Sequence, residues 1–190
     1  MSVFTDSEKF ALYSINIMLE TIGEQPLEDE IDLANSLEGS IASNTLEEVK
    51  KSVLSEGWDF NKDDNYSLVP NNDGFINIPL NILDINSSDD SSVIARDWRL
   101  YSKTTQDYWF EDAVSCDIIW DLEFNGLTHP IRHYITIKAA RIFQARLIGE
   151  GDAFTFSMED EQGARQAALN SDSRTKKHNW FTNNSSRAIR

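Results

Sequence analysis

The sequence predicts an α+β protein, in which a helical bundle carries an inserted small antiparallel β-sheet or barrel and an extended C-terminal tail. Apolar residues recur at helical spacing toward both ends of the chain, whereas a period of two and closely spaced turn signals mark the middle. The last residues are polar and show neither period. We therefore expect residues 1–57 and 128–176 to form the bundle, 58–127 the β insertion and 177–190 the tail.

The N-terminal third is expected to hold two helical regions. Over residues 7–21, apolar side chains recur every three or four positions and give one apolar face. Residues 32–56 form the second region, which we expect to be interrupted near Gly39. Asn44 or Thr45 is a plausible N-cap inside it, because short polar side chains accept hydrogen bonds from first-turn amides.

The middle of the chain predicts short strands separated by turns. Asn71-Asn72-Asp73-Gly74 is a strong turn signal, and Asn125-Gly126 is another. Short strands at such spacing are typical of a small antiparallel sheet or barrel. The candidate strands are residues 66–68, 82–85, 93–101, 108–110 and 115–124.

Two more helices are expected near the C-terminus. His129-Pro130 opens the third, since proline suits the first helical turn, and Gly149 should end it. The fourth should run from Met158 to about Lys176. It has acidic residues in its first turn and basic residues in its last, which suits the helix dipole at both ends.

Composition excludes several classes of protein. The 190 residues are too apolar for a disordered chain, and no apolar run approaches the roughly 20 residues of a membrane helix. The N-terminus lacks the pattern of a secretory signal, so synthesis in the cytoplasm is the expectation. Cys116 is the only cysteine, and it therefore has no intramolecular disulfide partner.

The net charge of −15 is unevenly distributed. Residues 1–57 carry 3 basic and 12 acidic side chains and residues 58–128 carry 4 and 14, whereas residues 129–190 carry 10 and 6. A soluble acidic protein is one interpretation. The other is head-to-tail association, in which the basic C-terminal third meets an acidic surface of a neighbour. A free nucleic-acid reader normally shows a basic face, which two thirds of this chain lacks.

The residues that usually carry cofactor, metal or nucleophile chemistry are sparse. The glycines form no phosphate-cradling loop or dinucleotide fingerprint. His129 and His133 share a helix face, but only His178 remains as a further imidazole, so we expect no metal site. Cys116 lies beside an acidic residue in an expected strand, which favours a buried structural thiol over a catalytic one. We predict no cofactor.

Glycoside hydrolysis is the one enzymatic alternative, because it needs two carboxylates about 5–10 Å apart. Adjacent acidic pairs occur at Asp63-Asp64, Asp89-Asp90 and Glu111-Asp112. Aromatic residues could supply a sugar platform, although aromatics in a small sheet more often build its core. These aromatics are Trp98, Tyr101, Tyr108, Trp109 and Trp120.

The basic residues of the third helix are more specific. Lys138, Arg141 and Arg146 lie on or beside its apolar stripe. Arginine is favoured where a desolvated ion pair must form. We therefore interpret these residues as candidate ion-pair partners of acidic groups, either within the fold or across a subunit boundary.

Three stretches together resemble a known family. Residues 17–26 include Ile-Gly-Glu followed by a proline, residues 55–61 include Gly-Trp-Asp-Phe-Asn, and residues 138–149 read Lys-Ala-Ala-Arg-Ile-Phe-Gln-Ala-Arg-Leu-Ile-Gly. Their order and spacing are similar to those of the tail tubular protein A family of short-tailed phages, the head-to-tail adaptors or gatekeepers.

The resemblance implies a structural protein of the virion tail and not an enzyme. It implies a ring of twelve copies between the portal protein and the nozzle, the tail tubular B protein. Its channel would pass double-stranded DNA without sequence-specific binding, and an acidic lumen would let the phosphates slide. A polysaccharide-degrading hydrolase of the tail is the alternative. No membrane partner is expected.

Overall fold

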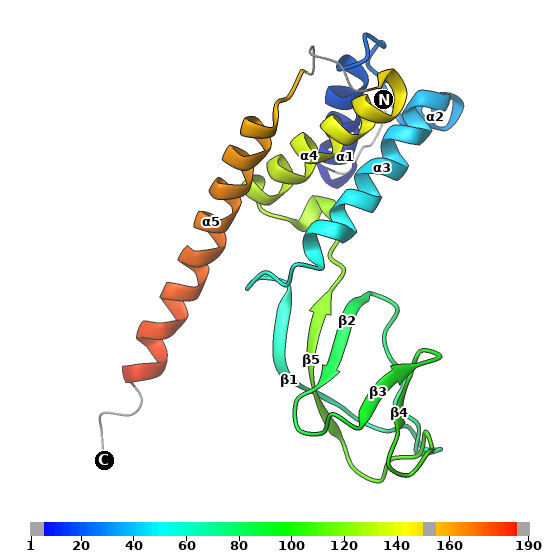
Figure 1. Cartoon of the computed structure of the whole chain (residues 1–190), viewed down its shortest axis with the longest axis vertical. Helices are drawn as coiled ribbons and strands as arrows, with labels where there is room; N and C mark the ends of the chain where they lie inside the picture. Colours follow the sequence, from blue (N-terminus) through cyan, green and yellow to red (C-terminus); the bar gives the residue numbers. More distant parts are fainter. Residues whose placement is uncertain (1–5, 150–154, 186–190) are drawn as a thin grey trace. The chain divides into compact units, whose positions relative to one another are not determined.

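The computed structural model describes residues 6–149 and 155–185, and it confirms the predicted α+β class (Figure 1). The chain divides into two compact units, a helical unit of Met1–Val53 with Glu123–Arg190 and a β unit of Leu54–Leu122. That residues 1–57 with 128–176 and residues 58–127 are separate folding domains stays a prediction.

The helical unit contains the expected helices. They are α1 (Asp6–Glu20), α2 (Glu30–Asn35), α3 (Leu37–Leu54), α4 (His129–Ile148) and α5 (Met158–Ser185), with a short 3-10 turn η1 (Phe124–Gly126) before α4. Helix α4 packs against α1 and α5. The predicted apolar faces form the core, in which Met18, Ile135 and Phe143 are fully buried.

The break in the second helical region lies at Ser36 and not at Gly39. Ser36 follows the last residue of α2, and its backbone amide donates to the carbonyl of Asp32. Its hydroxyl accepts from the Gly39 amide at the start of α3. The predicted N-cap at Asn44 or Thr45 is wrong, since both residues lie inside α3. Gly39 packs closely there, because a β-carbon on it would lie 2.8 Å from a terminal methyl of Leu27.

Helix α5 is longer than expected. It continues to Ser185, so the predicted tail is helical over residues 177–185, and residues 186–190 lie outside the described part. After Gly163 the helix contains no glycine or proline. No residue therefore stops it where the apolar period fades.

The β unit contains two small antiparallel sheets. The first has the strand order β1 (Lys62–Leu68), β5 (Val114–Trp120), β2 (Ile82–Ser87), and the second pairs β3 (Val93–Arg96) with β4 (Arg99–Ser102). The cluster of buried side chains in this unit is aliphatic. Its members are Leu68, Ile76, Ile78, Val93, Leu100, Cys116 and Ile118.

Three predicted strands differ from the structure. Residues 93–101 form a hairpin that turns at Asp97 and Trp98, which have φ of 51° and 58°. Such two-residue turns usually contain Asn-Gly, so the sequence shows no turn there. Residues 108–110 form only an isolated bridge from Trp109 to Phe75, and the last strand ends at Trp120 before η1.

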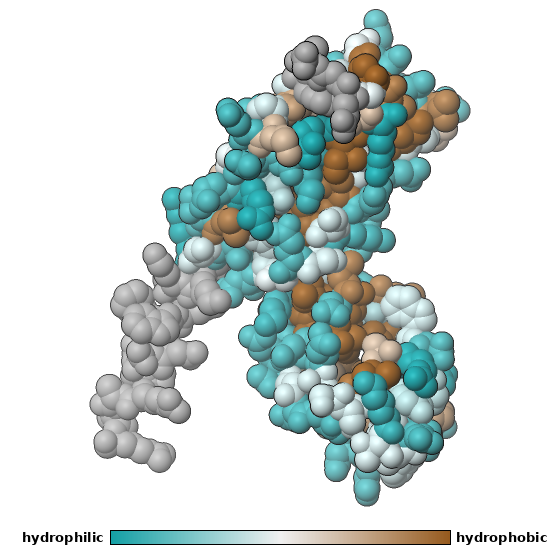
Figure 2. All heavy atoms as spheres, viewed as in Figure 1, coloured by the Kyte–Doolittle hydropathy of each residue, from teal (hydrophilic) through white to brown (hydrophobic). Residues whose placement is uncertain are grey.

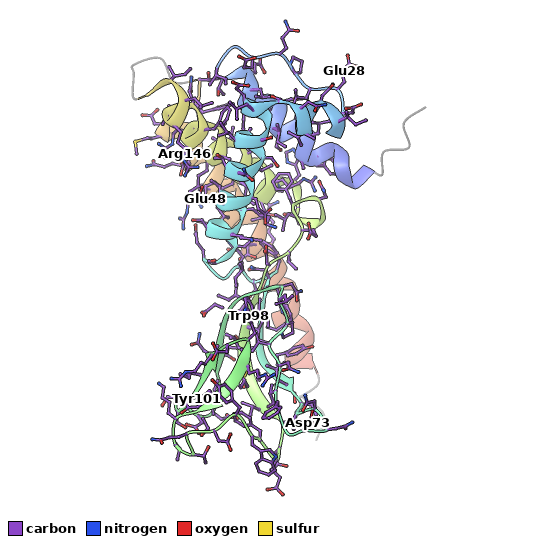
Figure 3. The ribbon with its side chains drawn as sticks, turned by 90° about the vertical axis from the view of Figure 1, so that its right-hand side faces the viewer. Glu28, Glu48, Asp73, Trp98, Tyr101 and Arg146 are labelled. Carbon is purple, nitrogen blue, oxygen red and sulfur yellow. The ribbon has the colours of Figure 1, made fainter. Side chains whose placement is uncertain are left out.

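The expectation that aromatics build the core of the β insertion is wrong for most of the five, although Trp120 packs against the buried cluster. Trp98 and Trp109 are 59% and 53% exposed, and the remaining three are partly buried. Figure 3 shows Trp98 and Tyr101 at separate places on the unit, so they form no common platform. On the face shown in Figure 2, the surface of each unit is mostly hydrophilic and includes apolar patches.

Asn61, the last residue of the Gly-Trp-Asp-Phe-Asn stretch, has a structural role in the β unit. Its side chain is 1% exposed and donates to the carbonyls of Leu54 and Trp120 at 3.0 and 2.9 Å. It also accepts from the Trp58 amide at 2.9 Å. One amide therefore joins the two chain segments at which the β unit begins and ends.

Candidate assembly surfaces

Arg141 of α4 forms an ion pair with the start of α5. Its Nε lies 2.7 Å from Glu161 Oε2, and the two side chains are 27% and 18% exposed. Glu161 stands in the first turn of α5, where negative charge is favourable. The pair therefore ties the beginning of α5 to the middle of α4.

Arg146, one turn further along α4, contacts α3. It donates to both carboxylate oxygens of Glu48 at 2.8 and 2.9 Å and to the Thr45 hydroxyl at 3.3 Å. Figure 3 shows the two charged side chains meeting between the helices. The hydrogen bond and charge of Arg146 lower the pKa of Glu48, and both groups are largely exposed.

Lys138 has a different environment, because its ammonium lies 5.7 Å from the centroid of the Tyr134 ring. Thus the described contacts of the three predicted residues are within the helical unit. Their role between subunits stays a prediction.

Sequence reasoning missed Gln144, which is 5% exposed on the apolar face of α4. Its Nε2 donates to the Thr21 carbonyl at 2.9 Å, and its Oε1 accepts from the Thr155 amide at 3.1 Å. Its position on an otherwise apolar stripe of α4 was the feature of the sequence that could have indicated a buried hydrogen-bonding residue. It links the end of α1 to the segment that leads into α5.

A groove of about 420 Å³ runs between α1 and α4. In its lining, the buried hydroxyls of Thr136 and Ser14 are hydrogen-bonded at 2.9 Å, and this bond joins the two helices. The groove is lined by Phe10, Tyr13, Ser14, Ile17, His129, Arg132, His133 and Thr136. Its size falls within the range of ligand-binding pockets, roughly 300–1,000 Å³.

Arg132 gives the groove its charge, and the sequence did not single it out. Its guanidinium lies 4.0 Å from the centroid of the Phe10 ring, a cation–π contact between α4 and α1. It also donates to the carbonyls of Asn125 and Leu127 just before α4. The residue therefore positions the start of α4 and places a cation at the groove.

His129 and His133 stack in the same groove, with ring centroids 6.1 Å apart. Burial, and then the neighbouring His129, lower the pKa of His133. Among the described residues no group of three or more His, Cys, Asp or Glu side chains could hold a metal ion.

Comparison with known proteins identifies the family of this chain. A family model described as "Tail tubular protein" matches residues 12–178. This chain belongs to the tail tubular protein family. Tail tubular protein A of Klebsiella phage KP34 is 30% identical over 153 residues, which cover 80% of this chain and 81% of the relative.

Membership makes the chain a structural component of a phage tail. Among the helices of residues 6–149 and 155–185, none combines the length and hydrophobicity of a membrane span.

In this tail tubular protein, two of the three acidic pairs lie close together. Asp89-Asp90 and Glu111-Asp112 line a pocket of about 440 Å³ with Trp109, whereas Asp63-Asp64 lies in β1. Hydrogen bonds from the backbone and side chain of Ser92 lower the pKa of Asp90. A glycosidase acid needs the opposite shift.

Cys116 lies in the aliphatic cluster of the tail tubular protein and is 0% exposed. Burial, and then the Asp117 carboxylate, raise the pKa of its thiol to about 11. A thiol with that pKa stays protonated near neutral pH and is a poor nucleophile.

Proposed function

We propose that this tail tubular protein forms a closed ring of identical subunits, twelve as the family resemblance implies, between the portal protein and the nozzle of the tail. It is made in the host cytoplasm and built into the virion tail, where double-stranded DNA passes through the ring without sequence-specific binding. Family membership over residues 12–178 is the observation that carries the proposal.

The distribution of charge supports a head-to-tail ring. Arg141 and Arg146 already contact acidic groups of the helical unit, so the basic surplus must come from elsewhere. After Asp172 the chain contains five basic residues and no acidic ones. The N-terminal 57 residues carry 12 acidic side chains. Opposite charges on two separate parts of a subunit favour a heterologous contact, and such contacts close into rings when the rotation permits.

The acidity of the chain supports passage of DNA. Phosphate binding depends on Lys and Arg contacts that release counterions, and a net charge of −15 disfavours such contacts on most surfaces. DNA would therefore slide through the ring without sticking to it.

The purified protein, alone and mixed with portal protein, tests this proposal by native mass spectrometry and negative-stain electron microscopy. We expect rings that weaken between low and high salt, because the contact is electrostatic. The variant Arg174→Glu/Lys176→Glu/Lys177→Glu should assemble less, and Lys103→Glu on the β unit is its control. A protein that stays monomeric with portal protein at every salt concentration contradicts the proposal.

The polysaccharide hydrolase is the competing function, and the pocket beside Trp109 is where it would be sought. A glycosidase acid must be protonated near neutral pH, whereas the pKa of Asp90 is shifted downward. We therefore assign no general-acid role to Asp90 and do not favour the hydrolase function. Turnover of host polysaccharide that disappears in Glu111→Gln or Asp112→Asn would reverse this assignment.

A further inference from the structure

The groove between α1 and α4 exposes large side chains. Tyr13 is 67% and Phe10 is 42% exposed, and both lie on the α1 side. Contiguous exposed apolar surface in a protein that assembles marks a site of contact. Among the residues whose side chains the structure describes, the lining of the groove includes Arg132, His129 and His133 but no carboxylate. The chemistry of the groove therefore suits an apolar segment that carries negative charge.

The same helical unit carries a segment of that chemistry, residues 28–38, which we name the acidic knob. It comprises helix α2 and the first residues of α3. Ile31 and Leu37 are each 70% exposed on it. The carboxylates of Glu28, Asp29, Asp32 and Glu38 surround these apolar side chains along the chain. Glu28, the first residue of the knob, is labelled in Figure 3.

The knob is held in place by its own contacts. Asp29 accepts from the Asp32 amide and caps α2, and Ser36 separates α2 from α3. Just before the knob, the backbone of Leu27 is fixed by Asn16, which accepts from the Leu27 amide at 2.9 Å and donates to its carbonyl at 3.0 Å. The exposed Ile31 is thus presented by a fixed short helix.

The knob and the groove lie on different sides of α1. The groove residues Phe10, Tyr13 and Ile17 share one face, and Asn16 lies about 90° around the helix from the centre of that face, at 100° per residue. Because Asn16 fixes the approach to the knob there, the knob begins from a position on α1 that does not line the groove. Each copy therefore offers one knob and one groove to other copies, which is the pattern of a heterologous, head-to-tail contact.

We infer that the acidic knob of one copy docks into the α1–α4 groove of the next copy. Ile31 and Leu37 cover the exposed rings of Phe10 and Tyr13, and the knob carboxylates face Arg132, His129 and His133. This inference rests on the proposed ring and names a second contact within it, besides the one made by the basic residues after Asp172.

A charge swap tests the contact with residues that are exposed in the single chain. Tyr13→Glu places a carboxylate in the groove, where it repels the acidic knob, and Ile31→Lys places a cation on the knob, where it repels Arg132. Each variant alone should weaken assembly at least roughly tenfold, as substitutions at interface centres do. An equimolar mixture should recover assembly, because the introduced lysine then meets the introduced glutamate while the unaltered knob meets the unaltered groove.

Cross-linking gives an independent readout. The double variant Tyr13→Cys/Ile31→Cys should form disulfide-linked ladders under mild oxidation, whereas each single variant should not, and Cys116 is buried. Ile148→Lys, at a side chain 62% exposed outside both surfaces, is the matched control and should assemble normally. Circular dichroism checks that every variant is folded.

The possible outcomes separate the inference from the proposed ring. Rings that form from every variant without ladders overturn the docking contact and leave the ring standing. A cross-link from Tyr13→Cys to portal protein assigns the groove to another partner and also overturns the contact. Unaltered protein that never assembles, even with portal protein, overturns both.

Discussion

The β unit and the helical unit bury and expose different kinds of side chain. The β unit encloses an aliphatic cluster and leaves Trp98 and Trp109 at its surface. The helical unit buries Tyr134 and Phe143, joins its helices by buried polar links, and exposes apolar residues in the groove and on the acidic knob. The difference indicates that aliphatic burial, together with the buried amide of Asn61, stabilises the β unit, whereas polar contacts between helices position the elements of a unit whose surface is suited to partners.

The largest expected effect tests the aliphatic cluster of the β unit. Ile118→Ala removes a side chain that is 0% exposed and should lower the free energy of unfolding by about 2–5 kcal/mol. Trp98→Ala removes a larger but mainly exposed side chain and should cost less than about 1 kcal/mol. Urea unfolding followed by tryptophan fluorescence measures both. Equal costs would contradict the aliphatic core.

The second prediction compares the buried amides of the two units. Asn61→Leu removes three hydrogen bonds to the backbone, and Gln144→Leu removes two. An unpaired buried polar group costs about 1–3 kcal/mol, so the Asn61 substitution should be the more damaging. Far-UV circular dichroism and tryptophan fluorescence during urea unfolding distinguish the units. Asn72→Leu, in an exposed turn, is the control.

The third prediction concerns the two arginines of α4. Arg141→Met leaves the half-buried Glu161 without its partner and should cost roughly 1–2 kcal/mol, between the values for exposed and buried pairs. Arg146→Met breaks a more exposed pair and should cost at most about 1 kcal/mol, with a stronger dependence on salt. Thermal unfolding at low and high salt measures both, and a larger loss for Arg146→Met would reverse this ranking.

The helices were largely predictable from sequence because their apolar period is long and regular. The ends of α4, for example, follow from Pro130 and Gly149. The break at Ser36 was not predictable, because Asn44 and Thr45 are equally good capping residues by type and the hydrogen bonds of Ser36 to Asp32 and Gly39 appear only in the structure. The helix beyond Lys176 has no apolar period, so periodicity could not reveal it.

The β unit and the assembly surfaces depend on contacts between distant residues, which local patterns do not encode. Asp97-Trp98 turns a hairpin without a turn signature because the Trp98 carbonyl accepts from Ile78 and the Leu100 amide donates to Ile76. Arg141 and Arg146 were recognised as charged residues beside an apolar stripe. Arg132 was not, because its contact with Phe10 spans most of the chain.

The smallest expected effect again separates the units, because all three histidines, at 129, 133 and 178, belong to the helical unit. The folded chain lowers the pKa of His133, so below about pH 6.5 the unfolded chain binds a proton more readily than the folded one. The stability of the helical unit should therefore fall as the pH decreases from 7 toward 5, until His133 is protonated in the folded state as well.

His133→Gln should flatten this dependence when unfolding is followed by far-UV circular dichroism, and His178→Gln is its control. In the β unit the carboxylate of Asp117 has a lowered pKa, because it accepts hydrogen bonds from Asn65 and Ser88. Its contribution is present above about pH 4 and is lost only below that pH. Tryptophan fluorescence, which reports mainly on the β unit, should therefore show constant stability between pH 7 and 5. A parallel decline in both signals would mean that the units unfold together and would remove the basis for comparing them.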